Sequence, residues 1–388
     1  MRTGIATIPL DYGKCPYWLF ERMRKLARGI ALAIVEEFGP EELLKRLSDP
    51  VWFQSFGCVL GFDWNSSGLT TTTMGALKEG LRGLENDLGL FICGGKGKTS
   101  RKTPEQIQSW GEFLGWPMKK IDKLVYASKI SAKIDSSALQ DGFQIYSHSL
   151  LFTKSGQWNV IQQGMNIDSQ KARRYHWLSS NVYNPSMSSG YNFIEEPHSG
   201  IISDIKVNPL NLTAKESNEN REISTALTKE KPKTFLKDFK KILERSDKFL
   251  IRKQKVDNLI LMELKDVEFH WHPVLKEKFD LKRLEKTISL AHSEEPETFE
   301  NLLALKGVGP KTIRALSLVS EIIYGAKPSY EDPARYSFAH GGKDATPFPV
   351  SRLLYDKTLE IMEKGIKESK ISNREKIEAQ RRLKTLNL

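Results

Sequence analysis

The sequence contains few cysteines and no long apolar run. Its 388 residues include three cysteines, Cys15, Cys58 and Cys93, and no two of them form a Cys-x-x-Cys pair. Neither a zinc ribbon nor a disulfide framework is indicated, and buried thiols in a reducing compartment are expected instead. No apolar stretch reaches the roughly 20 residues that span a bilayer, and the N-terminal residues lack the apolar core of a signal peptide. We therefore expect a cytoplasmic protein that does not associate with membranes.

Signatures of two enzyme classes are also missing. Gly97-Lys98-Thr99 matches the end of a P-loop, but Ile92 occupies the position at which that motif requires its first glycine. The PD-(D/E)xK string of metal-dependent nucleases is absent, and no segment repeats elsewhere in the chain. The sequence therefore has neither the P-loop of a nucleotidase nor the PD-(D/E)xK signature of a nuclease. It also does not predict a repeat architecture.

The composition has a moderate excess of positive charge. Lys and Arg together number 59, against 48 for Asp and Glu, which gives a net charge of +11 at pH 7. The length and the 39% of hydrophobic residues are enough for two or three domains with their own cores. The positive excess favours a nucleic-acid partner without requiring one.

The hydrophobic pattern predicts an α+β protein. Helical spacing dominates residues 15–56, a short strand is expected over residues 90–93, and a helix is expected to begin near Pro104. Two aromatic and β-branched runs within residues 142–166 flank the letters TKSGQ and predict a β-hairpin. Residues 211–234 are polar, which indicates a linker or long loop. We predict a mixed α/β N-terminal domain over residues 1–210, which would hold the catalytic residues, and an all-helical C-terminal domain over residues 235–388.

The stretch LLALKGVGPKTIRAL, residues 302–316, has the pattern of a phosphate-binding turn. Gly307 and Gly309 let the main chain approach a phosphate, and Pro310 suits the first turn of a helix whose free N–H groups attract anions. The pattern resembles the helix-hairpin-helix motif of DNA-binding proteins, which grips phosphates without reading bases. The resemblance implies DNA contacts by Gly307, Val308, Gly309, Lys311 and Thr312.

The same turn resembles that of the endonuclease III class of DNA glycosylases. In that class a lysine of the hairpin forms a Schiff base with the sugar, and an aspartate follows after the next loop. The resemblance implies these roles for Lys311 and Asp332, and such chemistry is plausible for a lysine of lowered pKa beside a carboxylate. No cysteine cluster follows the turn, so no iron–sulfur cluster is expected.

A second basic stretch, GGKGKTSRK, lies at residues 94–102. Its glycines and cations can hold a nucleic-acid backbone, and a flexible exposed loop is the alternative. The cations that we assign to this possible contact are Lys96, Lys98, Arg101 and Lys102.

Polar residues gather on the predicted hairpin and the segment that follows it. Alternation along a strand places Gln144, Tyr146 and His148 on one face. Carboxylate and imidazole ligands can hold a divalent cation such as Mg²⁺ or Mn²⁺, and arginines can take a scissile phosphate. We predict Asp141 and His148 as metal ligands, and a solvated sheet face with structural histidines is the alternative. The candidate catalytic residues of this nuclease site are Asp141, His148, Gln163, Arg173, Arg174 and His176.

The whole chain resembles the prokaryotic domain-of-unknown-function family 763. The strings FGCVLGFDWNSSG, VIQQGMN, ARRYHW and DPARYSFAHGGKDATPFPV carry the resemblance. It implies that the two halves form one working unit. In the last string, Lys343 is expected near a phosphate and beside Asp332.

Together these features predict a DNA-processing enzyme. The first interpretation is a metal-dependent nuclease that acts on structured or damaged DNA, duplex or branched. The second is a glycosylase or lyase that uses Lys311 and Asp332, and the third is a DNA-binding scaffold without catalysis. RNA stays an alternative partner.

Overall fold

The computed structural model describes residues 15–62, 66–187, 190–203, 205–255, 278–334, 360, 362–368 and 372–385. Lys343 lies outside the described residues. The helices before the sheet and between its strands are α1 (Tyr17–Phe38), α2 (Pro40–Ser48), α3 (Pro50–Val59), α4 (Gly68–Leu81), α5 (Glu85–Leu88), α6 (Thr103–Phe113), α7 (Met118–Ser137) and α8 (Ser179–Val182). The later helices are α9 (Asn218–Ala226), α10 (Pro232–Lys255), α12 (Leu281–Glu294), α13 (Phe299–Ala304), α14 (Pro310–Tyr324) and α16 (Asn373–Thr385). Three 3-10 turns are η1 (Gly97–Lys102), η2 (Lys215–Ser217) and η3 (Leu227–Lys229).

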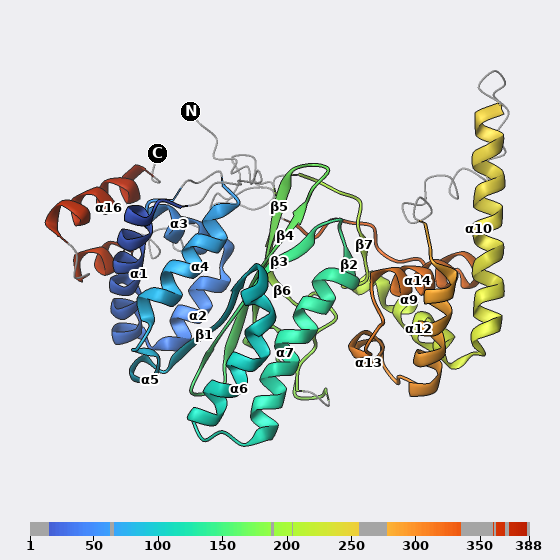
Figure 1. Ribbon diagram of the computed structural model, residues 1–388, viewed down its shortest axis with the longest axis horizontal. Coiled ribbons are helices and arrows are strands. Elements are labelled where there is room, and N and C mark those ends of the chain that lie inside the picture. The colour runs from blue at the N-terminus through green and yellow to red at the C-terminus, as the bar shows by residue number, and fades with distance from the viewer. Residues whose placement is uncertain are drawn as a thin grey trace.

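A five-stranded antiparallel sheet lies at the centre of the molecule (Figure 1), with the strand order β1-β3-β4-β5-β6. Its strands are β1 (Leu90–Lys96), β3 (Gln144–Thr153), β4 (Trp158–Asn166), β5 (Lys171–Leu178) and β6 (His198–Ile202). Two short strands, β2 (Leu139–Gln140) and β7 (Leu210–Asn211), pair separately. The predicted strand at residues 90–93 and the hairpin within residues 142–166 are confirmed as β1 and as β3–β4.

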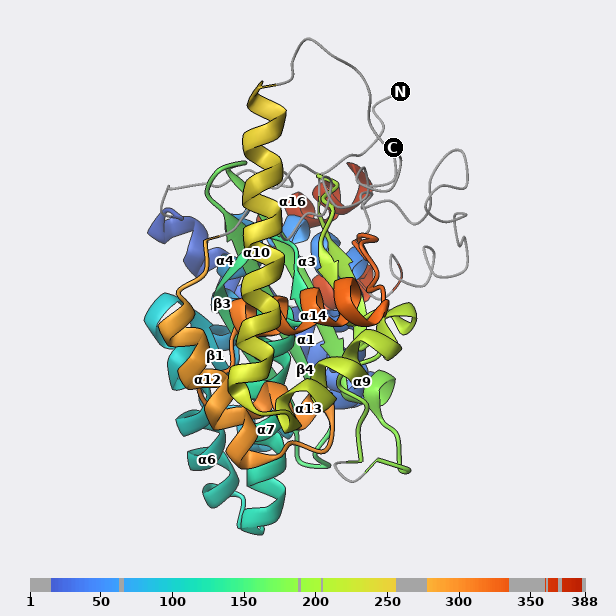
Figure 2. The same ribbon diagram turned by 90° about the vertical axis from the view of Figure 1, so that its right-hand side faces the viewer.

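Helices cover both faces of the sheet, and each face has its own apolar core. Alternate residues of a strand point to opposite sides, so Ile92 and Leu151 pack against α1–α4, whereas Phe91 and Phe152 pack against α6 and α7. The core on the α7 side continues into the helices α9, α10, α12, α13 and α14, which stand together on that side of the molecule (Figure 2). The α+β class is confirmed.

The polar segment 211–234 is ordered structure that packs into the molecule, not the linker or long loop that its composition indicates. It forms η2, α9 and η3 and enters α10. The amide of Asn220 donates to the carbonyl oxygens of Ser317 (3.1 Å) and Ala326 (2.7 Å), and the hydroxyls of Ser224 and Ser320 are 3.0 Å apart. The polar composition therefore reflects buried hydrogen bonds between α9 and α14.

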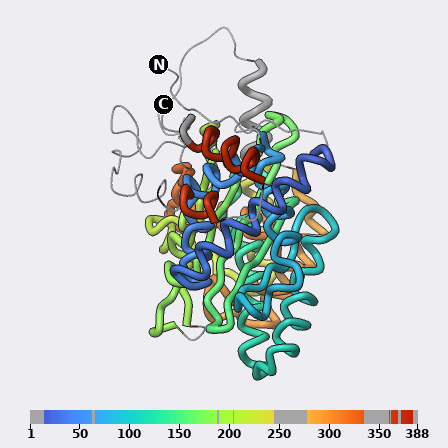
Figure 3. The backbone as a smooth tube through the Cα atoms, turned by 90° about the vertical axis from the view of Figure 1, so that its left-hand side faces the viewer, coloured from blue at the N-terminus to red at the C-terminus, as the bar shows by residue number. Residues whose placement is uncertain are grey.

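The C-terminal segment does not join the helices of the predicted C-terminal domain. Residues 362–368 and α16 lie beside α1 (Figure 3), where Met362, Ile366 and Leu383 belong to the core of α1–α4. Arg22 of α1 also pairs with Glu375 of α16 at 3.2 Å. Within the described residues, no helix is both long enough and apolar enough to cross a membrane.

Candidate nucleic-acid interface

A groove of about 700 Å³ opens between three parts of the chain that lie far apart in the sequence. Ser100 and Arg101 of η1 form one wall, and α7 with the start of β3 forms the floor. Pro310, Lys311 and Arg314, in the first turns of α14, form the other wall. The two stretches that the sequence marks as phosphate-binding therefore meet across one cavity, which we call the basic groove.

Positive side chains outnumber negative ones in the lining of the basic groove. Arg101, Lys129 and Lys311 are exposed, and Arg314 is half-buried where its Nε donates to Gln140 Oε1. Among the described residues that line the groove, Asp141 carries the one carboxylate. Four cations against one anion make the groove suited to a polyanion.

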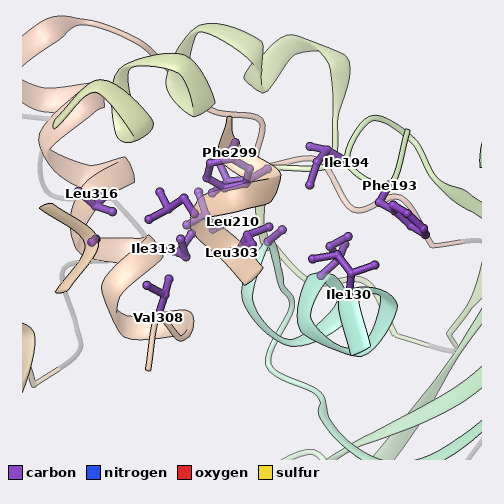
Figure 4. Close-up of a cluster of buried hydrophobic side chains, with 14 of the residues drawn as sticks. Ile130, Phe193, Ile194, Leu210, Phe299, Leu303, Val308, Ile313 and Leu316 are labelled. Atoms are coloured by element: carbon purple, nitrogen blue, oxygen red, sulfur yellow. The ribbon is translucent and has the colours of Figure 1, made fainter. Parts of the chain in front are cut away.

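The turn between α13 and α14 exposes its backbone, and the buried side chain of Val308 anchors it to the core. Gly307 has φ +94°, in the left-handed region that glycine tolerates best, and a Cβ there would meet nothing within 4 Å. Val308 is fully buried and packs with Leu303 and Ile313 (Figure 4). Gly309 is the N-cap of α14, and because it has no side chain it cannot cap the first N–H groups of that helix.

These contacts divide the five predicted DNA-contacting residues of the turn into two groups. Gly307 and Lys311 are exposed and Gly309 is half-buried. The side chains of Val308 and Thr312 are buried, so these two residues can offer only backbone groups to a ligand. The side chain of Lys311 donates to the carbonyl oxygen of Lys278 at 2.9 Å.

The basic stretch 94–102 leaves the sheet at β1 and turns through η1. Gly94 is required at this departure, because a Cβ there would come within 2.2 Å of the carbonyl oxygen of His148. Of the four predicted cations, Arg101 lines the basic groove, and Lys96 lies over the ring of Tyr146 at 5.9 Å. Lys98 and Lys102 are exposed on η1 outside the groove lining.

The six residues predicted for a nuclease site are buried, and they lie on both faces of the sheet. Arg173 and Tyr175 point toward one side, where both donate to Asp141, which directly follows β2; the Tyr175 Oη bond is 2.7 Å long. Arg174 and His176, which alternate with them, point toward α2 and α3. Neighbouring residues of a strand point to opposite faces of the sheet. Residues that are adjacent in the sequence are therefore separated in space, and the six do not form one site.

Arg173 holds two buried carboxylates together. Its Nη1 lies 3.0 Å from Asp141 Oδ2, and its Nη2 lies 2.8 Å from Asp332 Oδ2. Burial alone would raise the pKa of Asp332, but the charge of Arg173 and its hydrogen bonds outweigh that effect and lower it. Burial raises the pKa of Asp141, and the charge of Arg173 and the hydrogen bonds from Tyr175 and Phe143 oppose this rise without cancelling it.

The pair on the other face is closed off from solvent. Arg174 Nε donates to His176 Nε2 at 2.8 Å, and its Nη2 contacts Gln54 Oε1 at 3.0 Å. Burial lowers the pKa of Arg174 to about 9. Burial, followed by the charge of Arg174, holds the pKa of His176 well below its usual value. These contacts give Arg174 and His176 a structural role.

An irregularity in β3 separates side chains that strict alternation would place together. The register with β4 shifts between Ile145 and Ser147. As a result, Tyr146 Oη accepts a hydrogen bond from Gln163, whose amide also contacts the carbonyl oxygen of Ser67. His148 instead contacts Gln162, which points to the opposite face. The prediction that Tyr146 and His148 share a face is therefore wrong, because the shift adds a residue to the repeat.

The predicted metal ligands Asp141 and His148 are both engaged in hydrogen bonds within the protein. Asp141 accepts from Arg173 and Tyr175 at Oδ2 and from the backbone N–H of Phe143 at Oδ1. Both ring nitrogens of His148 have hydrogen-bond partners, Gln162 at 3.0 Å and Ser128 at 2.8 Å. In the described part of the chain, no three His, Cys, Asp or Glu side chains are grouped for a metal. A cation bound by this pair would have to compete with these hydrogen bonds.

The two residues of the lyase interpretation face different cavities. Lys311 lines the basic groove, whereas Asp332 lines a separate cavity of about 500 Å³ beside β6 and β7. The side chain of Asp332 is also buried against Arg173. A sugar bound at Lys311 would therefore not meet this carboxylate in the present arrangement.

The sequence patterns do not indicate several residues that line the groove. Lys129 lies mid-helix in α7, and Arg314 lies one turn after Lys311 on the same helix face. Ser128 was missed as well, although Ser128, Ser131 and Asp135 place three polar residues on the buried face of α7. This spacing is the sequence feature that could have indicated a buried polar site, because buried polar side chains need hydrogen-bond partners.

Comparison with known proteins finds one family. No curated protein and no solved structure gives a significant match to the chain. A family model described as a protein of unknown function, DUF763, matches residues 4–350. This match includes both walls of the basic groove and the sheet between them. The chain belongs to the DUF763 family of proteins of unknown function.

Proposed function

We propose that the protein binds the sugar–phosphate backbone of DNA in the basic groove, as part of a DNA-processing activity. One observation carries the proposal: Arg101, from the first basic stretch, and Lys311, from the glycine-rich turn, line the same cavity although they are 210 positions apart. Each stretch was assigned to phosphate on its own pattern. Their convergence supports one extended binding surface rather than two unrelated loops.

The charge of the groove supports a phosphate ligand. Arg101, Lys129 and Lys311 present exposed cations, and Asp141, the carboxylate of the lining, already accepts from Arg173. A duplex that enters the groove would therefore release counterions and meet no unpaired carboxylate among these lining residues.

The start of α14 adds a second kind of contact. The first N–H groups of a helix have no partner within it and carry the positive end of the helix dipole. At α14 they follow Gly309, an N-cap residue without a side chain to cap them. Such groups hold a phosphate oxygen without reading the base sequence, so we expect binding with little sequence preference.

DNA binding measured over a series of salt concentrations tests this proposal. We expect the logarithm of the binding constant to fall linearly with the logarithm of salt concentration. Lys129→Ala and Lys311→Ala should each reduce that slope by about 1. Lys327→Ala is the matched control, because Lys327 is exposed beyond the end of α14 and outside the groove lining. Equal slopes for all four proteins would contradict the proposal.

A further inference from the structure

A serine and a histidine form a hydrogen-bonded pair in the floor of the basic groove. Ser128 comes from α7 and His148 from β3, and the two side chains are 2.8 Å apart between Oγ and Nε2. Both residues line the groove, although they are only 3% and 5% exposed. A hydroxyl held against an imidazole at the base of a cavity is the arrangement of an activated nucleophile.

The hydrogen bonds around His148 fix which of its nitrogens carries the proton. Gln162 Nε2 donates to Asp135 Oδ2 at 2.6 Å, so Gln162 Oε1 is the atom that faces His148 Nδ1 at 3.0 Å. An amide oxygen only accepts, and Nδ1 must therefore be protonated. Burial lowers the pKa of His148 and keeps the ring neutral. Nε2 is then left as the acceptor for the Ser128 hydroxyl.

Asp135 holds this chain of hydrogen bonds in place. Its carboxylate is fully buried and also accepts from Trp177 Nε1 at 2.9 Å and contacts His198 Nε2. Gln162 and Asp135 thus set the tautomer and orientation of His148, as the third member of a catalytic triad does. They act through His148 and are positioning residues.

The pair on the opposite face of the sheet lacks these properties. His176 Nε2 accepts from Arg174 and its Nδ1 faces the carbonyl oxygen of Leu47. Neither nitrogen is left for a hydroxyl, and neither residue lines the basic groove. The groove is therefore built around one histidine whose Nε2 can accept a proton from a nucleophile.

We propose that Ser128 is a nucleophile and His148 its general base, and that they act on a DNA phosphodiester held in the basic groove. This inference rests on the proposed function, since the groove must first bind the backbone. A bond forms between Ser128 Oγ and phosphorus, and the bond from phosphorus to one sugar oxygen breaks. The serine proton passes to His148 Nε2 and then to the leaving sugar oxygen. The product is a strand end linked to Ser128 and a free sugar hydroxyl.

A water molecule completes the reaction. It attacks phosphorus, gives its proton to His148 Nε2, and the serine oxygen leaves and recovers that proton. The net reaction is hydrolysis of one phosphodiester. The cations of the groove, among them Lys129 next to the nucleophile in α7, offset the charge that develops on the phosphoryl oxygens. The step as written uses groups of this chain and water alone.

The experiment uses the full chain with end-labelled duplex and branched DNA in the presence of EDTA. Wild-type protein is expected to cut the DNA and to leave a covalent protein–DNA band on a denaturing gel, with the modification at Ser128 by mass spectrometry. Ser128→Ala and His148→Asn are expected to lower kcat by about 1000-fold or more, while the Kd for DNA changes less than about threefold. Ser131→Ala is the matched control, because Ser131 is also buried on α7 and its hydroxyl donates to the backbone oxygen of Ser128, away from His148; its kcat is expected to stay within about threefold.

The outcomes separate this inference from the proposed function. DNA that is bound but uncut by the wild type, or cut equally well by Ser128→Ala, overturns the catalytic pair and leaves DNA binding intact. Cleavage of RNA without cleavage of DNA overturns the substrate assignment. Failure to bind DNA at low salt overturns both proposals. Ser128→Ala removes one oxygen, and its thermal melting curve verifies that a loss of activity is not a loss of fold.

Discussion

Arg173 shows how a residue that is predicted for function can be needed for folding. Its guanidinium is fully buried and bridges Asp141 and Asp332, which come from widely separated parts of the chain. A buried ion pair adds little stability compared with an apolar substitute. Removal of one partner, however, strands the others without compensation, so the cluster is sensitive to single substitutions.

Substitution of Arg173 should therefore destabilise the protein strongly. Arg173→Met leaves two buried carboxylates without a counter-charge, and we expect the free energy of unfolding to fall by about 3–5 kcal/mol. Arg173→Lys keeps the charge but loses the two-pronged geometry, so its loss should be smaller. Urea unfolding followed by circular dichroism measures both. A loss below about 1 kcal/mol for Arg173→Met would show that the cluster is not a structural tie.

Because His148 and His176 are buried, we expect the free energy of unfolding to fall at mildly acidic pH. Burial lowers the pKa of His148, and burial together with Arg174 lowers that of His176. The unfolded chain binds protons near pH 6.5, where the folded protein does not. The stabilising contribution is thus present above about pH 6.5 and is lost as the pH falls below it toward the folded pKa values.

Urea unfolding at pH 7, 6 and 5 checks this dependence. The slope should approach about 1.4 kcal/mol per pH unit for each histidine. His148→Asn should remove one such increment, with His292→Asn as a control for an imidazole that is only half-buried. A free energy of unfolding that stays constant between pH 7 and pH 5 would contradict the burial of neutral histidines.

For single residues, the sequence indicates which polar side chains to consider but not which partners they contact. The letters ARRYHW in β5 suggested a polar site, and the hydrogen bonds show that these side chains alternate between two closed cores. Burial of charge depends on partners such as Asp332, far along the chain, which local pattern cannot reveal. The Ser128–His148 pair likewise joins residues of different elements.

Among the elements, the turn between α13 and α14 was predicted best. Pro310 begins α14 and Gly307 takes a left-handed conformation, both as the local pattern requires. These features are encoded by backbone chemistry within a few residues. The β3 irregularity near Tyr146 was not predictable in the same way, because it depends on the pairing with β4.

The two glycines of this turn should respond differently to substitution. Gly309 has an extended backbone, and a Cβ there would come no closer than 4.0 Å to any other group, so Gly309→Ala should fold with a loss of at most about 1 kcal/mol from helix capping. Its methyl group would stand at the start of α14, and we expect weaker DNA binding. Gly307→Ala forces a left-handed conformation on alanine, which should cost about 1–2 kcal/mol of stability.

Thermal melting and DNA-binding titrations separate the two effects. Gly325→Ala is a control for strain, since Gly325 is also left-handed (φ +77°) but lies at the other end of α14. It should lose stability and keep its DNA affinity. Undiminished affinity of Gly309→Ala would count against phosphate binding by the start of α14.

For the whole molecule, the sequence predicts the fold class but not how distant segments pack together. The α+β class follows from local periodicity, whereas the shared core of α7 with α13 and α14 depends on contacts between distant segments. The segment 211–234 was misinterpreted because polar residues that satisfy each other inside a protein have the same composition as a loop. Leu210 and Leu212 lie in that core as well.

The shared core predicts that the two halves fold together. Residues 1–210 expressed alone would expose the apolar side chains that pack against α13 and α14, including Ile130, Phe193 and Leu210. We expect this fragment to bind a hydrophobic dye and to lack a cooperative unfolding transition, whereas the full chain unfolds in one transition. A fragment that melts cooperatively at the temperature of the full chain would show that the N-terminal half is an independent domain.

We propose that DNA lies in the groove between η1, α7 and α14. Ser136 lines this groove and is exposed, and Ser293 is exposed on α12 outside the groove lining. A photoreactive amino acid at each position, one variant at a time, reports directly where bound DNA passes. We predict efficient cross-linking to duplex DNA from position 136 and background levels from position 293. Cross-linking from position 293 and none from position 136 would contradict the account.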